Sequence, residues 1–279
     1  MDIAVGIINW NSGHWLKGCI ASLLSTTDAA EIVVVDNAST DRSLEDAAGY
    51  GDRIRFVRNE SNLGFADGVN KAFASTSAPY VLILNPDIGV RTGVVERMRR
   101  FLDAHPKAAA IGGNVGKNYL PRRLPTAASL IRENLGLRKR SQEQAIQEPY
   151  EIEQAAAAAL MIRRSAYLEV GGFDSRFYPA WYEDVDFCKQ LQSGGWRIYF
   201  DPAAQFLHEG GYSAKALGTS AFAAAYYRNQ LRYVRKHMGK TAGMAIRCSL
   251  VAGMIVRTIA APAGAAAYWS VLAGALGRW

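Results

Sequence analysis

Short apolar runs without polar alternation recur along the first part of the chain. They occupy residues 3–8, 32–35, 54–57 and 80–84. Uninterrupted runs of this length are typical of strands that are covered on both faces, as in parallel sheets. Helical patterns follow at residues 15–24, from Gly64 to about residue 73, and at residues 92–104. Strands that alternate with helices in this way predict an α/β fold with a mostly parallel sheet, right-handed crossovers and flanking helices.

The pattern is weaker in the second part of the chain. Residues 113–150 are rich in Arg, Pro, Asn and Gln and show no clear period, so we expect a long loop near the functional edge of the sheet. Order returns with a strand predicted at Ala155–Ile162, a helix at residues 183–192 and a strand at residues 196–200. From Phe222 onward the sequence predicts helices.

Polar residues stand where the predicted strands end. Pro86 cannot donate to a ladder, so the strand at residues 80–84 ends before it and Asp87 lies at a carboxyl end. We expect that edge to gather Asp36, Asp41, Asp87, Glu183, Asp184 and His208. A carboxylate and a neutral imidazole can share a divalent cation, and that cation can neutralise a diphosphate leaving group. A second carboxylate nearby could act as a general base.

Each of these residues also has a simpler structural interpretation. Asn-Pro and Pro-Asp are common turn sequences, so residues 85–87 could form only a turn. Asp36 and Asp41 could cap a helix, and the acidic pair at residues 183–184 could be a charged helix start. His208 could be a hydrogen-bonded loop histidine. Their joint occurrence, more than any one of them, favours a functional site.

The distribution of charge and the number of cysteines limit the classes of protein to which the chain could belong. Residues 210–279 contain nine of the 32 Lys and Arg residues and no Asp or Glu, so the nearly neutral body is followed by a cationic tail. The three cysteines, at positions 19, 188 and 248, form no Cys-x-x-Cys pair, which argues against a zinc site or a disulfide framework. The first residues already resemble a strand, so we predict no secretory signal.

The tail combines basic and apolar residues. Arg228, Arg232, Arg235 or Lys236, and Lys240 fall on one face of a predicted helix. Two apolar segments follow, at residues 248–256 and 258–277. A basic helix beside apolar segments indicates peripheral or monotopic binding to a membrane, although two soluble helices packed on the body are the alternative. The small aliphatic residues here do not form the stacking platforms of a nucleic-acid site, so we expect no nucleic-acid partner.

Six motifs follow one another along residues 3–213. They are Val33–Asp41, Asn62–Ala66, Leu84–Asp87, Gly171–Asp174, Trp181–Asp186 and His208–Ser213. In residue types and order they resemble the motifs of glycosyltransferase family 2, and within it the bacterial rhamnosyltransferase-type branch. The resemblance implies a GT-A-type fold. We expect this domain at residues 1–220, followed by the helical membrane-associating tail at residues 221–279.

The resemblance also implies roles for the matching residues. The nucleotide pocket would contain Asn9, Asp36, Asn37, Asp41 and Asn85, and Asp36 would read the pyrimidine base. The divalent cation, Mg²⁺ or Mn²⁺, would be held by Asp87, with His208 on the metal or the diphosphate. Asp184 would be the catalytic base. The acceptor would be bound by Trp181, Tyr182 and Glu183, although the two aromatic residues could instead belong to the core.

Two departures from the family pattern shape the functional hypothesis. Asn85 replaces the first carboxylate of the fuller Asp-x-Asp motif, so the cation could depend on the phosphates of the donor. The Gln-x-x-Arg-Trp motif of processive members does not occur, which implies a single addition. We therefore expect an inverting transfer of one sugar from a nucleotide diphosphate donor, best matched by dTDP-L-rhamnose, to a lipid-linked or polysaccharide acceptor.

The resemblance and the tail place this reaction at the cytoplasmic face of the plasma membrane, in cell-envelope polysaccharide synthesis. The alternatives are a UDP-sugar-dependent transferase of the same fold and a non-catalytic, membrane-bound nucleotide-binding protein. No Gly-x-Gly-x-x-Gly follows the first strand, which argues against a nicotinamide-dependent oxidoreductase.

Overall fold

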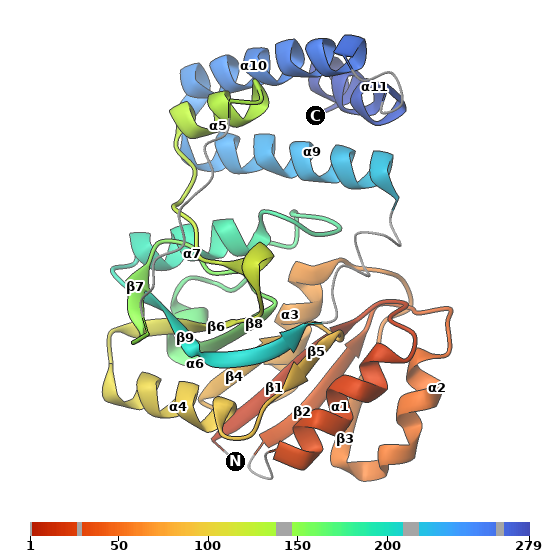
Figure 1. Cartoon of the computed structure of the whole chain (residues 1–279), viewed down its shortest axis with the longest axis vertical. Coiled ribbons are helices and arrows are strands. Elements are labelled where there is room, and N and C mark those ends of the chain that lie inside the picture. Colours follow the sequence, from red (N-terminus) through yellow and green to blue (C-terminus); the bar gives the residue numbers. More distant parts are fainter. Residues whose placement is uncertain (1, 27–29, 138–146, 209–217, 261–264) are drawn as a thin grey trace. The chain divides into compact units, whose positions relative to one another are not determined.

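A computed structural model describes residues 2–26, 30–137, 147–208, 218–260 and 265–279. The chain divides into two compact units (Figure 1). Within the described residues, the first unit, here called the sheet unit, consists of residues 2–26, 30–123, 147–179 and 183–208. The second, the helical unit, consists of residues 124–137, 180–182, 218–260 and 265–279. The predicted domain boundary near residue 220 stays a prediction.

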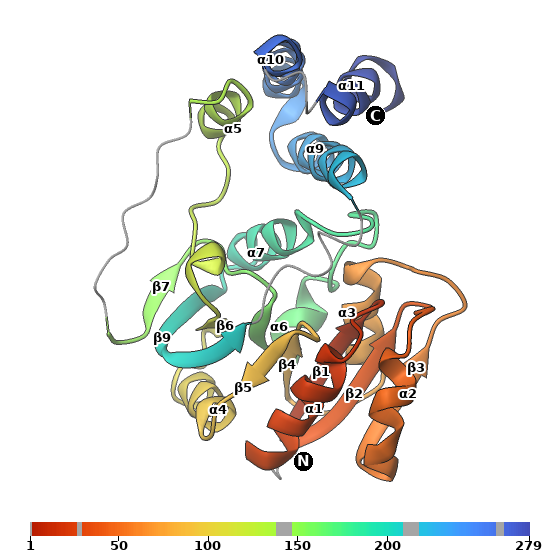
Figure 2. The same ribbon diagram turned by 45° about the vertical axis from the view of Figure 1, so that its right-hand side comes forward.

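The sheet unit is built around nine strands in the part of the chain that the structure describes. They are β1 (Ile3–Asn9), β2 (Ala30–Asp36), β3 (Ile54–Arg58), β4 (Tyr80–Leu84), β5 (Ile88–Val90), β6 (Ala108–Asn114), β7 (Tyr150–Ile152), β8 (Ala159–Arg163) and β9 (Arg197–His208). Their order is β3-β2-β1-β4-β8-β6-β9-β5, and β7 pairs with β9. The first four strands run parallel, and Figures 1 and 2 show them side by side.

Helices cover the sheet on both faces. The sheet unit contains α1 (Trp15–Thr26), α2 (Ser43–Ala47), α3 (Phe65–Ala74), α4 (Val94–Ala104), α6 (Arg164–Glu169) and α7 (Glu183–Ser193). Val5 and Leu82 share one core cluster with Leu16 of α1 and Met98 of α4. All five residues of β4 are buried, as the unbroken apolar run predicts for a strand covered on both sides.

Small residues let α3 lie close to the opposite face. A Cβ atom added at Gly6 would lie 2.8 Å from Cβ of Ala72, and one added at Gly68 would lie 2.6 Å from Cγ2 of Ile8. Real Cβ atoms do not approach so closely, so larger side chains at these positions would push helix and strand apart.

The second half of the sheet is mixed. Strand β8 runs antiparallel to both of its neighbours, β4 and β6, and β9 pairs parallel with β6 but antiparallel with β5 and β7. In Figure 1, β9 is the long cyan strand that curves across this half. The α/β class is confirmed. The continuous parallel part of the sheet consists of β1 to β4, and β6 with β9 is a separate parallel pair.

Two sequence predictions for the middle of the chain were wrong. Residues 113–150 are not one structureless loop, because they contain a 3-10 turn at Lys117–Tyr119, α5 at Ala127–Asn134 and the start of β7. These elements are too short to produce a visible period, although a capping box of Thr126 and Ser129 marks where α5 begins. The strand predicted from Ala155 begins only at Ala159, since residues 157–158 form a turn.

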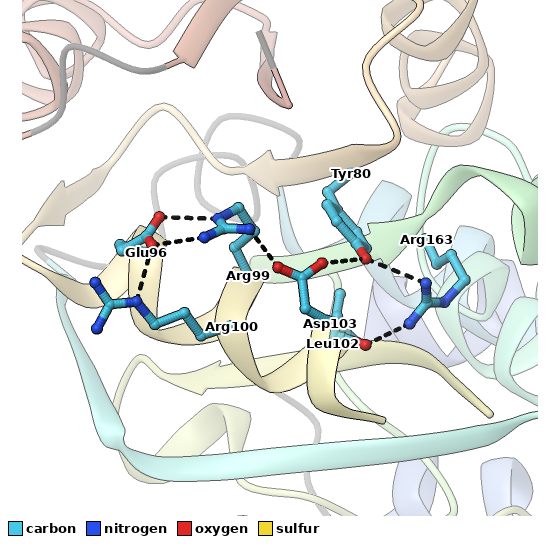
Figure 3. A network of polar contacts seen from close by, with 7 residues as sticks. All are labelled: Tyr80, Glu96, Arg99, Arg100, Leu102, Asp103 and Arg163. Carbon is cyan, nitrogen blue, oxygen red and sulfur yellow. Dashed lines mark hydrogen bonds and ion pairs between the residues drawn. The ribbon is translucent and has the colours of Figure 1, made fainter. Parts of the chain in front are cut away.

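A polar network ties α4 to β4 and β8 at the amino end of β4 (Figure 3). The Tyr80 hydroxyl donates to Oδ1 of Asp103 at 2.6 Å and accepts from Nη1 of Arg163 at 3.2 Å. Nη2 of Arg163 donates to the carbonyl of Leu102 at 2.5 Å, near the carboxyl end of α4. A cation there satisfies helix carbonyls that lack partners within the helix. This network lies at the opposite end of β4 from Asp87, so we assign it a structural role.

The helical unit packs around its own apolar core. It contains α5, α9 (Thr219–His237), α10 (Gly239–Ala260), α11 (Ala265–Ala273) and a final turn at Gly274–Arg278. Core residues from four elements include Leu130, Leu231, Leu250 and Val271. The predicted basic face does not continue through Lys240, because α9 ends before Gly239 and Lys240 belongs to α10.

Within the described residues, α10 is the one helix whose length and composition would let it cross a membrane. The same criterion admits core helices of soluble proteins. Of its most apolar 18-residue window, 28% is buried.

Candidate active site

The carboxyl ends of β1 and β2 carry the first polar cluster. Asn9 and Asp36 are register partners at the ends of these two parallel strands. Both side chains are buried, and Nδ2 of Asn9 donates to Oδ1 of Asp36 at 2.8 Å. Ser39 adds two donors, since its hydroxyl lies 2.6 Å from Oδ1 and its backbone N–H lies 3.1 Å from Oδ2 of Asp36. Asp36 therefore accepts three hydrogen bonds and keeps one free acceptor position on Oδ2.

Asn37 joins this cluster to the loop before α3. Its Nδ2 donates to the carbonyl of Gly64 at 3.1 Å, and its Oδ1 accepts from Nδ2 of Asn59 at 2.8 Å. Nζ of Lys71 in turn donates to Oδ1 of Asn59 at 2.5 Å. A buried amide with partners on both of its polar atoms is held in one orientation. The three loops that end β1, β2 and β3 thus form one hydrogen-bonded frame.

Asp41 fastens the loop after β1 to the loop after β2. Its Oδ2 accepts from the backbone N–H of Gly13 at 2.7 Å, and its Oδ1 accepts from the backbone and hydroxyl of Ser43. On the other side, Oδ1 of Asn11 accepts from the backbone N–H of Thr40 at 2.7 Å. These bonds hold the loop after β1 and the loop after β2 together.

The turn after β4 brings Asp87 to His208. Ile88 and His208 are register partners in the antiparallel pair of β5 and β9, so Asp87 lies next to the end of β9. Nε2 of His208 lies 3.4 Å from Oδ2 of Asp87, and the two side chains are 11% and 10% exposed. That contact is within ion-pair range but is not a hydrogen bond, and among the described residues Nε2 has no hydrogen-bond partner. A buried, unsatisfied ring nitrogen beside a carboxylate is a suitable arrangement for a cation.

Two further groups face this pair. The Tyr119 ring meets the His208 ring edge to face at a centroid distance of 4.7 Å. Burial raises the pKa of Tyr119, and the nearby Asp87 charge adds to the effect. Burial, again with a smaller contribution from Asp87, raises the pKa of the Cys19 thiol to about 12. Both groups therefore stay neutral at physiological pH.

Glu183 and Asp184 lie in the first turn of α7. Glu183 is 6% exposed, and its Oε2 has no hydrogen-bond partner within the described part of the chain. Burial, reinforced by the neighbouring Asp184 charge, raises the pKa of Glu183 well above its ordinary value. Burial also raises the pKa of Asp184, against backbone hydrogen bonds from Val185 and Ala157. A carboxylate with a raised pKa is a better proton acceptor near neutral pH.

A backbone link connects Asp184 with the turn that carries Asp87. Asp184 accepts a hydrogen bond from the backbone of Ala157, and the carbonyl of the next residue, Ala158, accepts from the N–H of Asn85 at 3.0 Å. Asn85 directly precedes Pro86 and Asp87 in the same turn. The turn at residues 157–158 therefore joins the first turn of α7 to the Asn85–Asp87 turn.

Trp181 and Tyr182 belong to the helical unit. Both have positive φ angles, 72° and 73°, which are uncommon for residues other than glycine. Tyr182 is 5% exposed and packs edge to face on Tyr226 at 5.3 Å, so its ring is a core residue. Trp181 is half-buried and meets Phe222 at 4.5 Å.

The structure thus groups the sequence candidates into connected sets within the sheet unit. Asn9, Asp36, Asn37 and Asp41 form the frame, and Asp87 and His208 form a pair that Asn85 and two alanines connect to Asp184. Residues 209–213 of the last motif lie outside the described residues. Within the described ranges, no group of three or more His, Cys, Asp or Glu residues could hold a metal ion.

Several contributing residues were not identified from the sequence. Ser39 and Asn59 lie in polar turns that the sequence indicates, but their spacing gives no reason to single them out. Tyr119 comes from a segment without periodicity, so it had no sequence signal. Arg122, whose charge lowers the pKa of Asp184, lies in an isolated bridge with Gln154 and had no sequence signal either.

Residues 4–171, more than half of the chain, match the family described as "Glycosyl transferase family 2". An N-acetylglucosaminyl-diphospho-decaprenol L-rhamnosyltransferase of Mycobacterium tuberculosis is 26% identical over 266 residues, covering 85% of each chain. The rhamnosyltransferase WbbL of Escherichia coli K12 is 23% identical over 249 residues, covering 83% of this chain and 93% of that protein.

Solved structures show the same fold. A mannosyltransferase from Pyrobaculum calidifontis, in complex with GDP-Man and Mn²⁺, has a TM-score of 0.61 at 15% identity and covers 99% of this chain and 87% of that one. GalNAc-T7 with UDP, GalNAc and Mn²⁺ has a TM-score of 0.65 at 16% identity, covering 84% of this chain and 48% of that one. Both are GT-A glycosyltransferases, which confirms the expected fold class. The chain therefore belongs to glycosyl transferase family 2 and is a glycosyltransferase.

Proposed function

We propose that the protein transfers one L-rhamnosyl residue, with inversion, from dTDP-L-rhamnose to a lipid-linked or polysaccharide acceptor. The link from Asp184 through Ala157 and Ala158 to the Asn85–Asp87 turn carries this proposal, because it connects a candidate base with a candidate diphosphate site. The names of the two rhamnosyltransferases support the choice of sugar, and the name of the Mycobacterium tuberculosis protein supports a lipid-linked acceptor.

The frame of Asn9, Asp36, Asn37 and Asp41 would hold the nucleotide. Asp36 has one free acceptor position, which suits the single N–H that a thymine or uracil ring offers. Asn85 would complete the pocket near the phosphates. Its side chain is half-buried, and its backbone is fixed by the bond to Ala158.

Asp87 and His208 would hold a divalent cation, Mg²⁺ or Mn²⁺. The unsatisfied Nε2 of His208 beside the Asp87 carboxylate fits such a group. Two protein ligands suit a cation that takes its remaining ligands from substrate phosphates and water. When bound, the cation supplies charge neutralisation for the leaving diphosphate.

Asp184 would act as the base. Its carboxylate takes the proton from an acceptor hydroxyl, the freed oxygen forms a bond to the anomeric carbon, and the bond from that carbon to the diphosphate oxygen breaks on the opposite face. Glu183 stays protonated over a wider pH range, because burial raises its pKa well above the ordinary value. A neutral neighbour avoids a second negative charge beside the base. Glu183 would lie on the acceptor side, whereas the buried Tyr182 ring belongs to the core of the helical unit.

We also propose that residues 221–279 hold the enzyme at the cytoplasmic face of the plasma membrane, while residues 1–220 carry the catalytic domain. The helical unit exposes many large apolar side chains: Leu135, Leu137, Met244, Ile255, Val256, Ile259, Trp269 and Leu276. Along α10 the exposed positions 244, 255 and 259 alternate with the buried positions 246, 250 and 254. An apolar outer face on a cationic tail suits a surface of anionic lipids.

The donor and the base are tested with the full-length protein. Thermal unfolding is recorded with dTDP, UDP or GDP in the presence of Mn²⁺, because a ligand that binds the folded state raises the unfolding temperature. We expect dTDP to stabilise most and EDTA to remove most of the shift. The Asp184→Asn variant should keep the dTDP shift and lose transfer of rhamnose.

Other outcomes would favour the alternative functions. A larger rise in unfolding temperature with UDP than with dTDP would favour a UDP-sugar donor. If the Asp184→Asn variant transfers rhamnose at the wild-type rate, Asp184 is not the base. If excess EDTA changes neither the shift in unfolding temperature nor the transfer activity, Asp87 and His208 do not hold a required metal. Nucleotide binding without transfer to any lipid-linked or polysaccharide acceptor would favour a non-catalytic binding protein.

Membrane binding is tested by flotation with vesicles that contain anionic lipids. The Ile255→Glu and Ile259→Glu double variant should reduce the bound fraction, because two charges would enter the apolar face of α10. Leu168→Glu is the matched control, since Leu168 is also exposed, at 62%, but lies in α6 of the sheet unit. Equal binding by the double variant and the control would contradict this part of the proposal.

A further inference from the structure

The chain that follows β6 brings a tyrosine to the candidate cation pair of Asp87 and His208. Strand β6 runs parallel to β9, and Asn114, the last residue of β6, is the register partner of Gln205. His208 is the last residue of β9 and lies three positions beyond Gln205. Because the two strands run in the same direction, the segment after β6 passes the end of β9. In that segment, the Tyr119 ring meets the His208 ring edge to face, at a centroid distance of 4.7 Å and an interplanar angle of 73°.

A tight turn holds the segment between β6 and Tyr119. Oδ1 of Asn114 accepts from the backbone N–H of Gly116 at 3.1 Å, and the N–H of Tyr119 donates to the Gly116 carbonyl at 3.0 Å. Gly116 has a φ angle of 107°, which residues with a Cβ atom rarely adopt. Val115 is buried in the apolar core of the sheet unit, and the half-buried Tyr119 packs against the same core. The turn and this packing together fix where the Tyr119 ring lies.

Packing restrains the orientation of the His208 imidazole. Its Nε2 lies 3.4 Å from Oδ2 of Asp87, and no hydrogen bond holds this nitrogen within the part of the chain that the structure describes. The Cβ–Cγ bond of a histidine has a broad rotational profile, so the ring could turn and carry Nε2 away from Asp87. Two aromatic rings in edge-to-face contact lose that contact when one of them turns. The Tyr119 ring therefore opposes the rotation that would separate Nε2 from the carboxylate.

We infer that Tyr119 is a positioning residue for the candidate cation pair. Its ring keeps the His208 imidazole turned so that Nε2 faces the Asp87 carboxylate, and a cation then meets both ligands without a prior rearrangement. All three residues belong to the sheet unit. The inference rests on the proposed function, in which Asp87 and His208 hold Mg²⁺ or Mn²⁺. Tyr119 acts through His208, and its ring carries the effect, not its hydroxyl.

The test compares Tyr119→Leu with Tyr119→Phe in the full-length protein. Leucine removes the aromatic ring, whereas phenylalanine keeps the ring and removes only the hydroxyl. Mn²⁺ is titrated into the metal-free protein, with and without dTDP, and the EPR signal of the free ion gives the Kd for Mn²⁺. We expect this Kd to rise about three- to tenfold in Tyr119→Leu, which is the factor that an aromatic pair contributes. The Kd should keep its wild-type value in Tyr119→Phe.

A second EPR measurement reports the ligand itself. The nitrogen of a coordinated imidazole modulates the electron spin echo of bound Mn²⁺, so the depth of this modulation shows whether His208 is a ligand. The modulation should be equal in the wild type and Tyr119→Phe and weaker in Tyr119→Leu. A loss of stability alone would not change it, because it is measured on the bound ion. Equal modulation in Tyr119→Leu and the wild type would contradict the inference.

Tyr150→Leu is the matched control. Tyr150 is also half-buried in the sheet unit, and its ring meets the Phe200 ring edge to face at 5.8 Å and 67°. This variant should lose stability to a comparable extent and keep the wild-type Kd for Mn²⁺. If Tyr119→Leu raises that Kd no more than Tyr150→Leu does, the positioning role is wrong. If Tyr119→Phe raises it as much as Tyr119→Leu, the hydroxyl acts instead of the ring, and the inference is also wrong.

A third readout does not need a metal. In crystal structures of the variants, the distance from Nε2 of His208 to Oδ2 of Asp87 should stay near 3.4 Å in Tyr119→Phe and increase in Tyr119→Leu. Tyr119→Met replaces the leucine variant if that variant does not fold. An imidazole that keeps its orientation without the Tyr119 ring would overturn the inference. If the wild type binds no Mn²⁺ while the imidazole turns away in Tyr119→Leu, the proposed metal role is refuted and the positioning of His208 by Tyr119 stands.

Discussion

Replacing Asp36 by asparagine tests the proposal that the frame of Asn9, Asp36, Asn37 and Asp41 binds a nucleotide. The carboxylate accepts from Nδ2 of Asn9 at 2.8 Å and from the hydroxyl and backbone N–H of Ser39 at 2.6 and 3.1 Å. An asparagine has one oxygen in place of two. If the oxygen takes the Oδ1 position, its NH₂ group opposes the N–H of Ser39. If the amide is flipped, the NH₂ group opposes Nδ2 of Asn9.

Either orientation leaves one buried donor facing another donor. An unsatisfied buried polar group costs about 1–3 kcal/mol, so the free energy of unfolding should fall by about that amount. For a chain of this size the unfolding temperature changes by about 2–4 °C for each kcal/mol. If Asp36 also accepts from the pyrimidine ring, a charge-assisted hydrogen bond of about 1.5–3 kcal/mol is lost. That loss corresponds to a rise of about 10- to 150-fold in the Kd for dTDP.

Calorimetric titration with dTDP and with GDP, together with urea unfolding, measures both effects. Asp201→Asn is the stability control, because Asp201 is fully buried and accepts from the N–H of Ala203 at 3.0 Å outside the frame. That variant should lose stability and keep the wild-type Kd for dTDP. An Asp36→Asn protein that binds dTDP as tightly as the wild type, with the same preference over GDP, would refute the assignment of Asp36 to the base.

Two other outcomes follow from burial and packing. Because the pKa of Glu183 is raised, the folded state binds more protons than the unfolded state above the ordinary carboxyl pKa, so the free energy of unfolding falls as the pH rises through that range. Glu183→Gln should flatten this part of the pH profile, measured by urea unfolding at pH 4 to 8. An unchanged slope would contradict the raised pKa of Glu183. Gly68→Ala should cost about 1–3 kcal/mol in the same assay, because its Cβ would lie 2.6 Å from Ile8, and a neutral effect would show that α3 can move away from the sheet.

The sequence was sufficient for the first half of the sheet. The unbroken run at residues 80–84 predicts a strand that is buried on both faces, and β4 has these bounds. Pro86 then ends the strand, which is why the sequence alone assigns Asp87 to the carboxyl edge. Local chemistry decides these features, so local sequence reveals them.

The rest depended on long-range pairing. Strand β8 begins with the small residue Ala159. The antiparallel direction of β8 is set by its pairing with β4 and β6, which lie far away in the sequence. No local pattern could show that Tyr119 would reach the His208 ring or that a turn at residues 157–158 would join Asp184 to Asn85. The burial of Tyr182 was equally hidden, because its partners come from α9 of the helical unit.

The pairing of β5 with β9 has a consequence for synthesis of the chain. Asp87 and His208 are 121 positions apart, and β5 has no other strand partner in the described sheet. The hydrogen-bond partners described above for Asn9, Asp36, Asn37 and Asp41, by contrast, all lie within the first 64 residues. A nascent chain could thus form these bonds early, while the candidate cation pair must wait until β9 has left the ribosome. The pair of Asp87 and His208 would therefore be the last part of the candidate site to form during synthesis.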